Sequence, residues 1–240
     1  MKPTPSFLAL GALLATAFSA FGDESLAPLF NNLDAFVKPD GWAIVKAVEG
    51  DAKEKRWAKT EPGTGILING EQGKAGNLVT RDGFADVEAH IEFMIPKGSN
   101  SGIYFQQCYE VQILDSFGKK DGELGVHDCG AIYERWDEKR EPKGYEGTVP
   151  RINASKAPGE WQTFDIIFRA PRFNEKGEKT ENARFVKVVH NGTVIHENIE
   201  LSGPTRGGNA TEVAKGPFTI QGDHGPVAFR KFEVKPVNLD

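Results

Sequence analysis

Residues able to bind a hydroxyl-rich ligand or to move a proton concentrate in two stretches of the sequence. The first runs from Tyr104 to Gln112 and combines an aromatic ring, amides and the carboxyl group of Glu110. Aromatic rings can lie against the C–H faces of sugars, while amides and carboxylates bond to their hydroxyl groups. The second is the segment Gln-Gly-Asp-His-Gly, in which His224 can change its charge near neutral pH and Asp223 can orient that imidazole or bind a cation. The alternative for this segment is a simple turn in which Asp223 caps backbone amides.

A predicted hairpin positions the first stretch, and burial selects its register. If Phe105 pairs with Tyr109 across a three-residue turn, the apolar residues share one face: Ile103, Phe105, Tyr109, Val111 and Ile113. A one-residue slip would place Glu110 on the same face as Phe105, which burial disfavours. The opposite face then carries Tyr104, Glu110 and Gln112, with Gln106 at its edge. This row is either a sugar-binding surface or an ordinary solvated face.

Short strands separated by Gly, Pro and Asn follow one another along the chain. The clearest spans 84–95, where apolar and polar residues alternate as in a strand with one buried face. His90 lies between two acids on the other face of this strand and is predicted to be solvated or hydrogen bonded. The further expected strands are 42–48, 65–68, 77–80, 101–105, 109–115, 130–133, 161–170, 184–190, 193–201, 218–221 and 227–234. Their hairpin-like spacing, without an amphipathic helix or a repeat, predicts an all-β sandwich of two antiparallel sheets.

The connections between these strands differ in length. Asn191-Gly192 lies between two expected strands and predicts a tight type I′ turn. Two other connections, 116–128 and 134–160, are long. Loops of this length in a compact domain are usually functional or disordered, and the aromatic residues Trp136 and Tyr145 in the second favour a functional role.

The composition excludes some classes of function. The chain has 240 residues, of which 39% are hydrophobic and 26% are charged, so it can form a real core. The 27 glycines and 14 prolines fit a fold with frequent turns. A formal net charge of −5 gives no cationic field that would attract nucleic acid or an anionic membrane, and neither is expected as a partner.

The N-terminal segment has the features of a secretory signal peptide. Lys2 precedes the apolar run Phe7–Phe21, and small residues follow it. We expect residues 1–22 to be removed, with cleavage near Ala20 to Gly22, which leaves a single domain over 23–240. The apolar run is shorter than the roughly 20 residues of a membrane span, and no cysteine near it offers a lipid-attachment site. The expected location is therefore periplasmic or secreted, without a membrane span.

The chain contains two cysteines, Cys108 and Cys129. Because thiols outside the cytosol are commonly oxidised, this pair is predicted to form a disulfide. It would close a loop of about 22 residues and contribute roughly 3 kcal/mol. A reactive thiol or a metal ligand is the alternative.

Several sequence blocks together resemble one known family. In chain order they are NSGIYF from Asn100, YEVQILDSFG from Tyr109, DCGAIY from Asp128, PGEWQTFDIIFRAPRF from Pro158, HNG from His190 and QGDHGPVAFRKFEV from Gln221. The chain resembles the 3-keto-disaccharide hydrolase family, long known as a domain of unknown function. Two shorter segments, LFN from Leu29 and GW from Gly41, also resemble the first strand of this family. Typical members carry Arg where this chain has Gln106. The resemblance implies a concanavalin A-like jelly roll, as in laminarinase-type glycosidases and legume lectins.

The resemblance also implies cleavage of 3-keto-glycosides by elimination and hydration. A carbonyl at C3 acidifies the C2 hydrogen, so a base can remove it, the C1 substituent leaves and water then adds. On this basis Glu110 is the expected base, His224 the next candidate acid or base, and Asp223 its neighbour. The expected substrate contacts are Tyr104, Gln106, Gln112, Gln221 and Arg230, with Arg230 as a partner of the enolate or of a hydroxyl group.

Two alternative functions suit the same fold: a non-catalytic carbohydrate-binding module, and a structural or adhesive envelope protein. A binding module needs aromatic platforms but no titratable base on the concave face, so Glu110 beside Gln112 favours the enzyme. The expected partner is an oxidised disaccharide or glycoside. No cofactor is expected, and no ligand spacing demands a divalent cation near Asp223, His224 and Glu110.

Overall fold

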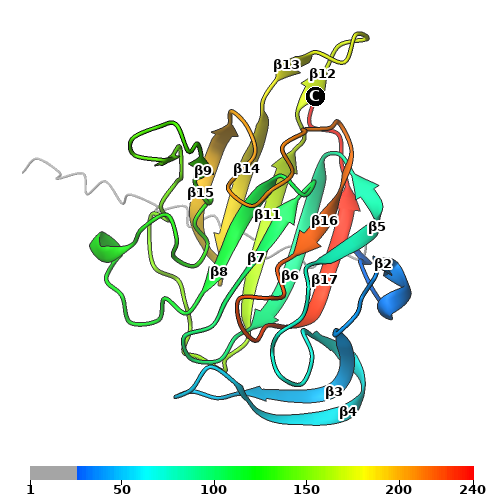
Figure 1. Ribbon diagram of the computed structural model, residues 1–240, viewed down its shortest axis with the longest axis vertical. Helices are drawn as coiled ribbons and strands as arrows, with labels where there is room; N and C mark the ends of the chain where they lie inside the picture. The colour runs from blue at the N-terminus through cyan, green and yellow to red at the C-terminus, as the bar shows by residue number, and fades with distance from the viewer. Residues whose placement is uncertain (1–25) are drawn as a thin grey trace, which may run out of the picture.

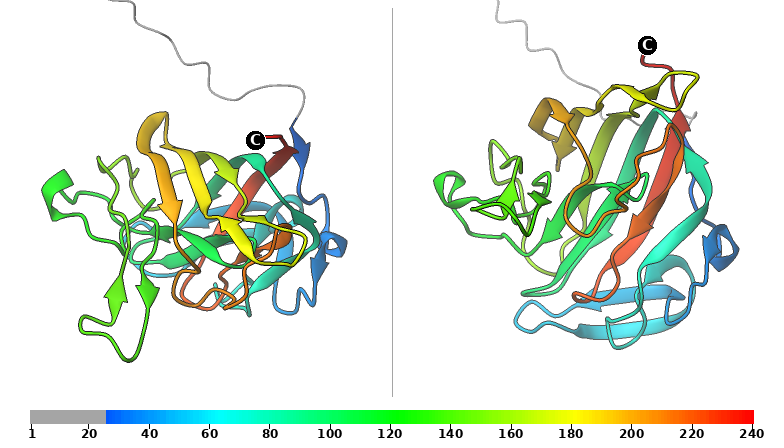
Figure 2. Two further views of the ribbon diagram at one scale, coloured as in Figure 1. Left: turned by 90° about the horizontal axis from the view of Figure 1, so that it is seen from above. Right: turned by 45° about the horizontal axis from the view of Figure 1, so that its top comes forward.

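Two antiparallel sheets lie face to face in the computed structural model, which describes residues 26–240 (Figures 1 and 2). The predicted signal peptide, residues 1–22, lies outside the described residues. In spatial order the larger sheet contains β15 (Thr193–Leu201), β14 (Ala183–His190), β11 (Gln162–Arg169), β6 (Val87–Met94), β17 (Ala228–Pro236), β4 (Trp57–Ile68) and β3 (Ala43–Gly50), with β1 (Ala27–Pro28) paired to β17. The smaller sheet contains β2 (Phe36–Val37), β5 (Leu78–Phe84), β16 (Gly216–Ile220), β7 (Asn100–Phe105) and β8 (Tyr109–Leu114).

The remaining elements are short. Two small hairpins pair β9 (Arg135–Trp136) with β10 (Gly144–Tyr145) and β12 (Arg172–Phe173) with β13 (Lys179–Glu181). Two single turns of 3-10 helix, η1 (Leu33–Ala35) and η2 (Asp121–Glu123), are the only helical elements of the described residues. The protein is therefore an all-β jelly-roll sandwich of the concanavalin-like type, as predicted from the sequence. None of the helices in the described part of the chain is long and apolar enough to cross a membrane.

Phenylalanine rings fill the space between the sheets. Phe105 of the five-stranded sheet packs against Phe168 and Phe185 of the eight-stranded sheet, with ring centroids 5.1 and 5.2 Å apart. Phe218 of β16 contacts Phe232 of β17 in the same way, at 5.1 Å. Aromatic pairs in edge-to-face or tilted contact contribute beyond their buried area, so this cluster fixes how the two sheets face each other.

The alternation predicted for residues 84–95 is confirmed in β6. Its inward residues are buried in the core, namely Val87, Ala89, Ile91 and Phe93. His90 faces the other way and is hydrogen bonded, as predicted: its Nδ1 lies 2.6 Å from Asp165 and its Nε2 3.4 Å from Glu92. The period of two predicted this strand correctly because one of its faces is buried in the core and the other carries polar side chains.

The predicted register of one hairpin and the predicted tight turn of another are both confirmed. In β7–β8, Phe105 pairs with Tyr109 and Tyr104 with Glu110. Asn191 and Gly192 connect β14 to β15 with φ values of 49° and 80°, the left-handed conformations that a type I′ turn requires.

Two of the expected strands differ clearly from the structure, and six short strands were not predicted. The strand expected at 65–68 is the end of the longer β4, which begins at Trp57. The strand expected at 130–133 makes only isolated bridges, through Ile132 to Val111 and Thr148. The short strands β1, β2, β9, β10, β12 and β13 were not predicted, because two or three residues carry no readable period.

The predicted disulfide is wrong, because Cys108 and Cys129 are both buried free thiols. Cys108 precedes β8, whereas the Cys129 thiol interacts with the backbone of Leu114 at the far end of the same strand. Six residues of strand span about 20 Å, and a disulfide needs Cα atoms within about 7 Å. Burial raises the pKa of each thiol to about 12, so neither is an activated nucleophile.

Candidate functional site

A polar cavity of about 290 Å³ lies on the outer face of the five-stranded sheet. Its volume is close to the lower limit of about 300 Å³ for small-molecule sites. The lining residues come from β7, β8, the turn after β16 and two loops: Asn100, Tyr104, Glu110, Gln112, Tyr133, Arg206, Gly207, Gln221 and His224. Five of the eight predicted catalytic or substrate-binding residues therefore line a single cavity: Tyr104, Glu110, Gln112, Gln221 and His224.

The row predicted on the outer hairpin face is present, but it is not an open surface. Tyr104, Glu110 and Gln112 are only 5, 2 and 4% exposed. The chain after β8 pairs with the edge of this strand through the backbone hydrogen bonds from Gln112 to Ala131 and from Tyr133 to Glu110, and Tyr133 lines the cavity beside the row together with the 206–207 loop. The sheet face is thus the floor of an enclosed site rather than a solvated surface.

Glu110 is the buried carboxyl group of this floor. It extends over Gly102 of β7, and a Cβ atom at Gly102 would lie only 1.9 Å from its Oε1. Glycine inside a strand often marks such a close approach. Burial raises the pKa of Glu110 from 4.5 to about 8, and the hydroxyl of Tyr104 opposes this rise only partly. An ionisable group with this pKa can take up or release a proton near neutral pH.

Tyr104 lies directly opposite Glu110 on β7. Its hydroxyl interacts with the Glu110 carboxyl group and lies 3.5 Å from the carbonyl oxygen of Arg206. Burial and the nearby Glu110 charge raise the pKa of Tyr104 above its ordinary value. Tyr104 is consequently a hydrogen-bond donor in this site rather than a base.

The loop between β15 and β16 forms one wall of the cavity. Thr205 fixes it to the sheet, because its Oγ1 accepts from the Glu110 backbone N–H at 3.1 Å and donates to the Cys108 carbonyl at 3.1 Å. The next residue, Arg206, places its guanidinium 3.8 Å from the centre of the Trp136 ring. This wall brings a permanent positive charge to the cavity.

Tyr133 comes from the chain segment that follows β8. Its ring is stacked on His127, with centroids 5.0 Å apart. Burial and the charge of Glu110 raise the pKa of Tyr133, while Arg206 opposes the rise. The electrostatic effects indicate that the side chains of Tyr133, Glu110 and Arg206 share one small polar environment.

His224 lies at the exposed rim, on the turn between β16 and β17. Its Nδ1 is 2.6 Å from the carboxylate of Asp223, which therefore orients the ring. The imidazole lines the cavity, whereas Asp223 remains half exposed outside it. This arrangement agrees with the predicted role of Asp223 as a neighbour that orients His224.

Three amide side chains complete the lining. Gln112 accepts a hydrogen bond from the Ile113 N–H at 3.0 Å, which fixes its orientation. Gln221 is tied to β7 through its backbone, which donates to Gly102 and accepts from Ser101. The Oδ1 atom of Asn100 is buried without a hydrogen-bond partner. A buried polar atom without a partner in a cavity is a natural contact for a ligand.

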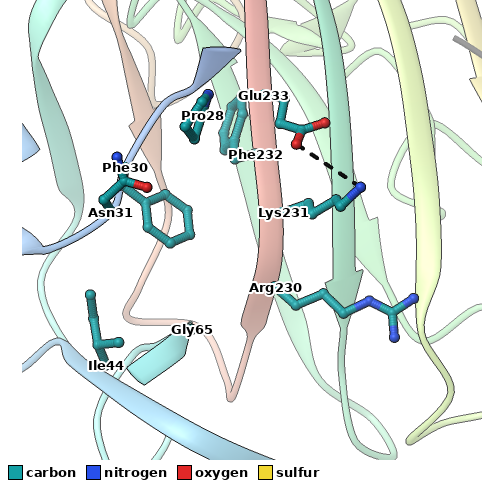
Figure 3. A pocket seen from close by; sticks show the side chains of 9 residues that line it. All are labelled: Pro28, Phe30, Asn31, Ile44, Gly65, Arg230, Lys231, Phe232 and Glu233. Atoms are coloured by element: carbon teal, nitrogen blue, oxygen red, sulfur yellow. Dashed lines mark ion pairs between the residues drawn. The ribbon is translucent and has the colours of Figure 1, made fainter. Parts of the chain in front are cut away.

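Two predicted substrate contacts lie elsewhere. Gln106, at φ 53°, turns its amide away from the cavity and donates to the carbonyls of Phe84 and Ala214. Arg230 is on the eight-stranded sheet, where it pairs with Glu92 and lies 4.7 Å from the Trp161 ring centre. Figure 3 shows Arg230 beside a different cavity, with its side chain directed away from Phe30. These two expectations were wrong. Gln106 lies in the turn that follows β7, and Arg230 lies in β17 of the other sheet, so neither residue reaches the cavity.

Sequence reasoning missed Asn100, Tyr133 and Arg206. Asn100 and Tyr133 stand inside two of the sequence blocks quoted above, so those blocks held a usable signal. Arg206 is in an irregular loop without hydrophobic periodicity, and no sequence feature marked it. Within residues 26–240, no group of three or more His, Cys, Asp or Glu side chains is arranged to hold a metal ion.

Comparison with solved structures identifies similar proteins. A candidate glycosyl hydrolase from Parabacteroides distasonis ATCC 8503 aligns with a TM-score of 0.60 at 25% identity, covering 89% of this chain and 84% of the other. A second candidate glycosyl hydrolase from the same organism aligns with a TM-score of 0.58 at 20% identity, covering 88% and 99% of the two chains. The second likeness supports the fold alone. No match was found among curated proteins.

The family comparison covers most of the chain. Residues 27–235 match the model of the 3-keto-alpha-glucoside-1,2-lyase-like domain. This range includes all but the last residue of the two sheets and every residue that lines the cavity. The protein therefore belongs to the family of 3-keto-alpha-glucoside-1,2-lyase-like domains.

Proposed function

We propose that this protein is a carbohydrate-active enzyme that cleaves 3-keto-glycosides, with Glu110 as the base that removes the C2 proton. The observation that carries the proposal is a buried carboxyl group with a pKa of about 8 on the floor of a polar cavity. The family name and the similar candidate glycosyl hydrolases support carbohydrate chemistry. The 1,2-lyase in the family name corresponds to an elimination across C1 and C2.

The proposed reaction begins at the carbon next to the ketone. The Glu110 carboxylate takes the proton from C2, and the electron pair of that bond forms a C2=C3 double bond with an enolate oxygen at C3. Arg206 lines the same cavity and is the cation suited to this oxygen, and Tyr104 can donate a hydrogen bond to it. Both groups are held before the charge develops, so they need little reorganisation.

The second half of the reaction breaks the glycosidic bond. The enolate electrons re-form the C3 carbonyl and create a C1=C2 double bond as the C1–O bond breaks. The leaving oxygen takes a proton from His224, whose ring is oriented by Asp223. Water then adds its hydroxyl to C1 and a proton to C2, so the products are the free 3-keto sugar and the released alcohol or sugar.

Incubation with 3-keto-trehalose or 3-keto-lactose tests the proposal. We expect the purified protein to release the second sugar and to leave the unoxidised disaccharides intact, because only the ketone acidifies the C2 hydrogen. Absence of release, together with saturable binding of unmodified glycans, would instead identify a carbohydrate-binding module. Equal cleavage of oxidised and unoxidised substrates would contradict the elimination mechanism.

A further inference from the structure

The guanidinium of Arg206 lies on the ring of Trp136 rather than on the carboxyl group of Glu110. Its Cζ atom is 3.8 Å from the centre of the Trp136 ring. Arg206 and Glu110 line the same cavity, yet within the described part of the chain no ion pair joins them, and only burial and the Tyr104 hydroxyl shift the pKa of Glu110. Because charges in buried surroundings are ordinarily paired, this separation calls for a group that holds the cation away.

The backbone of Arg206 is close enough to Glu110 for the long arginine side chain to turn onto its carboxyl group. The Arg206 carbonyl oxygen lies 3.5 Å from the Tyr104 hydroxyl, which itself interacts with the Glu110 carboxyl group. The Arg206 backbone N–H donates to the Glu134 carbonyl oxygen at 2.8 Å, so the loop is fixed at this place. The direction of the side chain therefore decides which group the guanidinium meets.

The hairpin β9–β10 fixes the ring that receives the guanidinium. Trp136 is half-buried in β9, and its Nε1 donates to Glu138 at 2.7 Å. The second carboxylate oxygen of Glu138 pairs with Lys143 of the same hairpin, also at 2.7 Å. The charge of Arg206 helps to lower the pKa of Glu138, so the guanidinium lies toward this hairpin. Since an arginine over the face of a tryptophan is a favourable contact, the hairpin competes with Glu110 for the cation.

Every element around Glu110 contributes a titratable or charged group: Tyr104 from β7, Tyr133 from the segment after β8, Arg206 from the loop before β16, and His224 with Asp223 from the turn after β16. Among these groups Arg206 alone carries a permanent positive charge. A cation within about 4–6 Å lowers the pKa of a carboxyl group by about 1–3. An arginine paired with Glu110 would weaken the base and would no longer be available to the substrate.

We propose that Trp136 is a positioning residue, which holds the Arg206 guanidinium on the cavity wall so that it meets the enolate oxygen and does not pair with Glu110. The part of this inference that concerns the enolate rests on the proposed function. The separation of Arg206 from Glu110 is a property of the protein without substrate and can be measured there.

Titration of the Glu110 carboxyl group in the substrate-free protein tests this role. NMR of ¹³C-labelled glutamate side chains follows the pKa, and E110Q identifies the signal. We expect W136A to lower the pKa of Glu110 from about 8 by about 1 or more, because the released guanidinium turns onto the carboxylate. W136F should stay near wild type, since its ring still receives the guanidinium. The matched control is W161A, which removes the ring 4.7 Å from Arg230 on the other sheet and should leave this titration unchanged.

Two variants of Arg206 separate positioning from a purely structural effect. W136A/R206Q should return the pKa of Glu110 to about 8, because the cation that would pair with it is gone. R206Q alone should leave this pKa unchanged, and it tests the separation without altering the hairpin if W136A does not fold. An unchanged pKa in W136A, a fall that persists in W136A/R206Q, an equal fall in W161A, or a higher pKa in R206Q than in wild type would overturn the proposal.

Turnover of 3-keto-trehalose gives a second readout. We expect W136A to lower kcat about tenfold with KM little changed, because Arg206 acts on charge that develops in the transition state. The ascending limb of kcat/KM should move to lower pH together with the pKa of Glu110, and W136F should recover most of the rate. A higher KM with unchanged kcat would overturn the positioning role. If the wild type turns over no 3-keto-glycoside, the proposed function fails, and the titration alone decides whether Trp136 holds Arg206 away from Glu110.

Discussion

Two glutamates on the outer faces of the two sheets show how the same side chain is used differently. Glu92 and Glu110 are both poorly exposed, and burial by itself would raise the pKa of both carboxyl groups. At Glu92, hydrogen bonds from Arg230 and His90 outweigh burial, and the pKa falls below its ordinary value. At Glu110 the only opposing contact is the Tyr104 hydroxyl, and the pKa rises to about 8.

The difference indicates which face carries chemistry. A charged network such as that of Glu92 is satisfied within the fold, whereas the Glu110 carboxyl group forms no ion pair with the described residues, and only the Tyr104 hydroxyl lowers its pKa. An uncompensated buried carboxyl group destabilises a fold, and such groups are concentrated at functional sites. The proposed catalytic role therefore belongs to the five-stranded sheet, and the Glu92 network has a structural role.

Exchanging each glutamate for glutamine should separate the two roles most strongly. We expect E110Q to lower turnover of a 3-keto-disaccharide at least ~100-fold, the scale of a lost general base. E92Q should leave turnover unchanged and lower the stability by on the order of 1 kcal/mol, because Arg230 is half exposed and solvent screens the pair. Steady-state kinetics and thermal unfolding of both variants measure these effects.

The stability of E110Q should change in the opposite direction. The pKa of Glu110 is higher in the folded chain than its ordinary value of 4.5, so the fold loses stability as the pH rises from about 4.5 to about 8. Glutamine removes this loss, and at pH 8 the Tm of E110Q should equal or exceed that of wild type. A lower Tm for E110Q at pH 8 would show that Glu110 is a structural group.

Displacing the Glu110 carboxyl group without changing its chemistry should have the next largest effect. A methyl group at Gly102 would overlap Oε1, so we expect G102A to lower turnover about 10- to 100-fold, within the range for a misplaced catalytic group. The control is G122A, because a Cβ at Gly122 meets nothing within 4 Å and its backbone needs no positive φ. Full activity in G102A would mean that the position of this carboxyl group is not critical.

The smallest expected effect is a pH dependence of stability at the Glu92 network. The hydrogen bond that His90 donates to the Asp165 carboxylate raises the pKa of His90 above 6.5, with Glu92 contributing. The stabilisation is therefore complete below pH 6.5 and is lost as the pH rises through the folded pKa. Each kcal/mol of this pH-dependent stabilisation corresponds to a change of about 2–4 °C in the Tm of the wild-type protein. H90Q should lack this component between pH 6 and 9, and an identical pH profile in both proteins would remove His90 from the account.

Much of the fold and half of the site could be predicted because burial left a regular pattern. The β7–β8 register followed from five apolar residues that cannot share a face with Glu110. That register alone places Tyr104, Glu110 and Gln112 together on one face of the hairpin. The covering segments were not predictable in this way, since the backbone of residues 130–133 and 205–207 is held by irregular hydrogen bonds without a sequence period.

The errors have physical reasons as well. Arg230 follows His224 by six residues, but by then the chain has entered β17 of the other sheet, with a register shift between Phe229 and Lys231. The two cysteines were paired by their number and expected compartment, although a strand separates them. Closeness in sequence is a poor guide to closeness in space where the chain crosses from one sheet to the other. The number of cysteines alone does not show that they are near each other.

The pH dependence of kcat/KM tests the central claim most directly, because it reports the ionisation of the essential group in the free enzyme. A base acts in its deprotonated form, so the ascending limb of kcat/KM for a 3-keto-disaccharide should follow a pKa of about 8, and a descending limb at higher pH reports the acid that protonates the leaving oxygen. The residual activity of E110Q should lack this rise. A rise centred near the ordinary carboxyl pKa of 4.5, or the same rise near pH 8 in E110Q, would contradict Glu110 as the base.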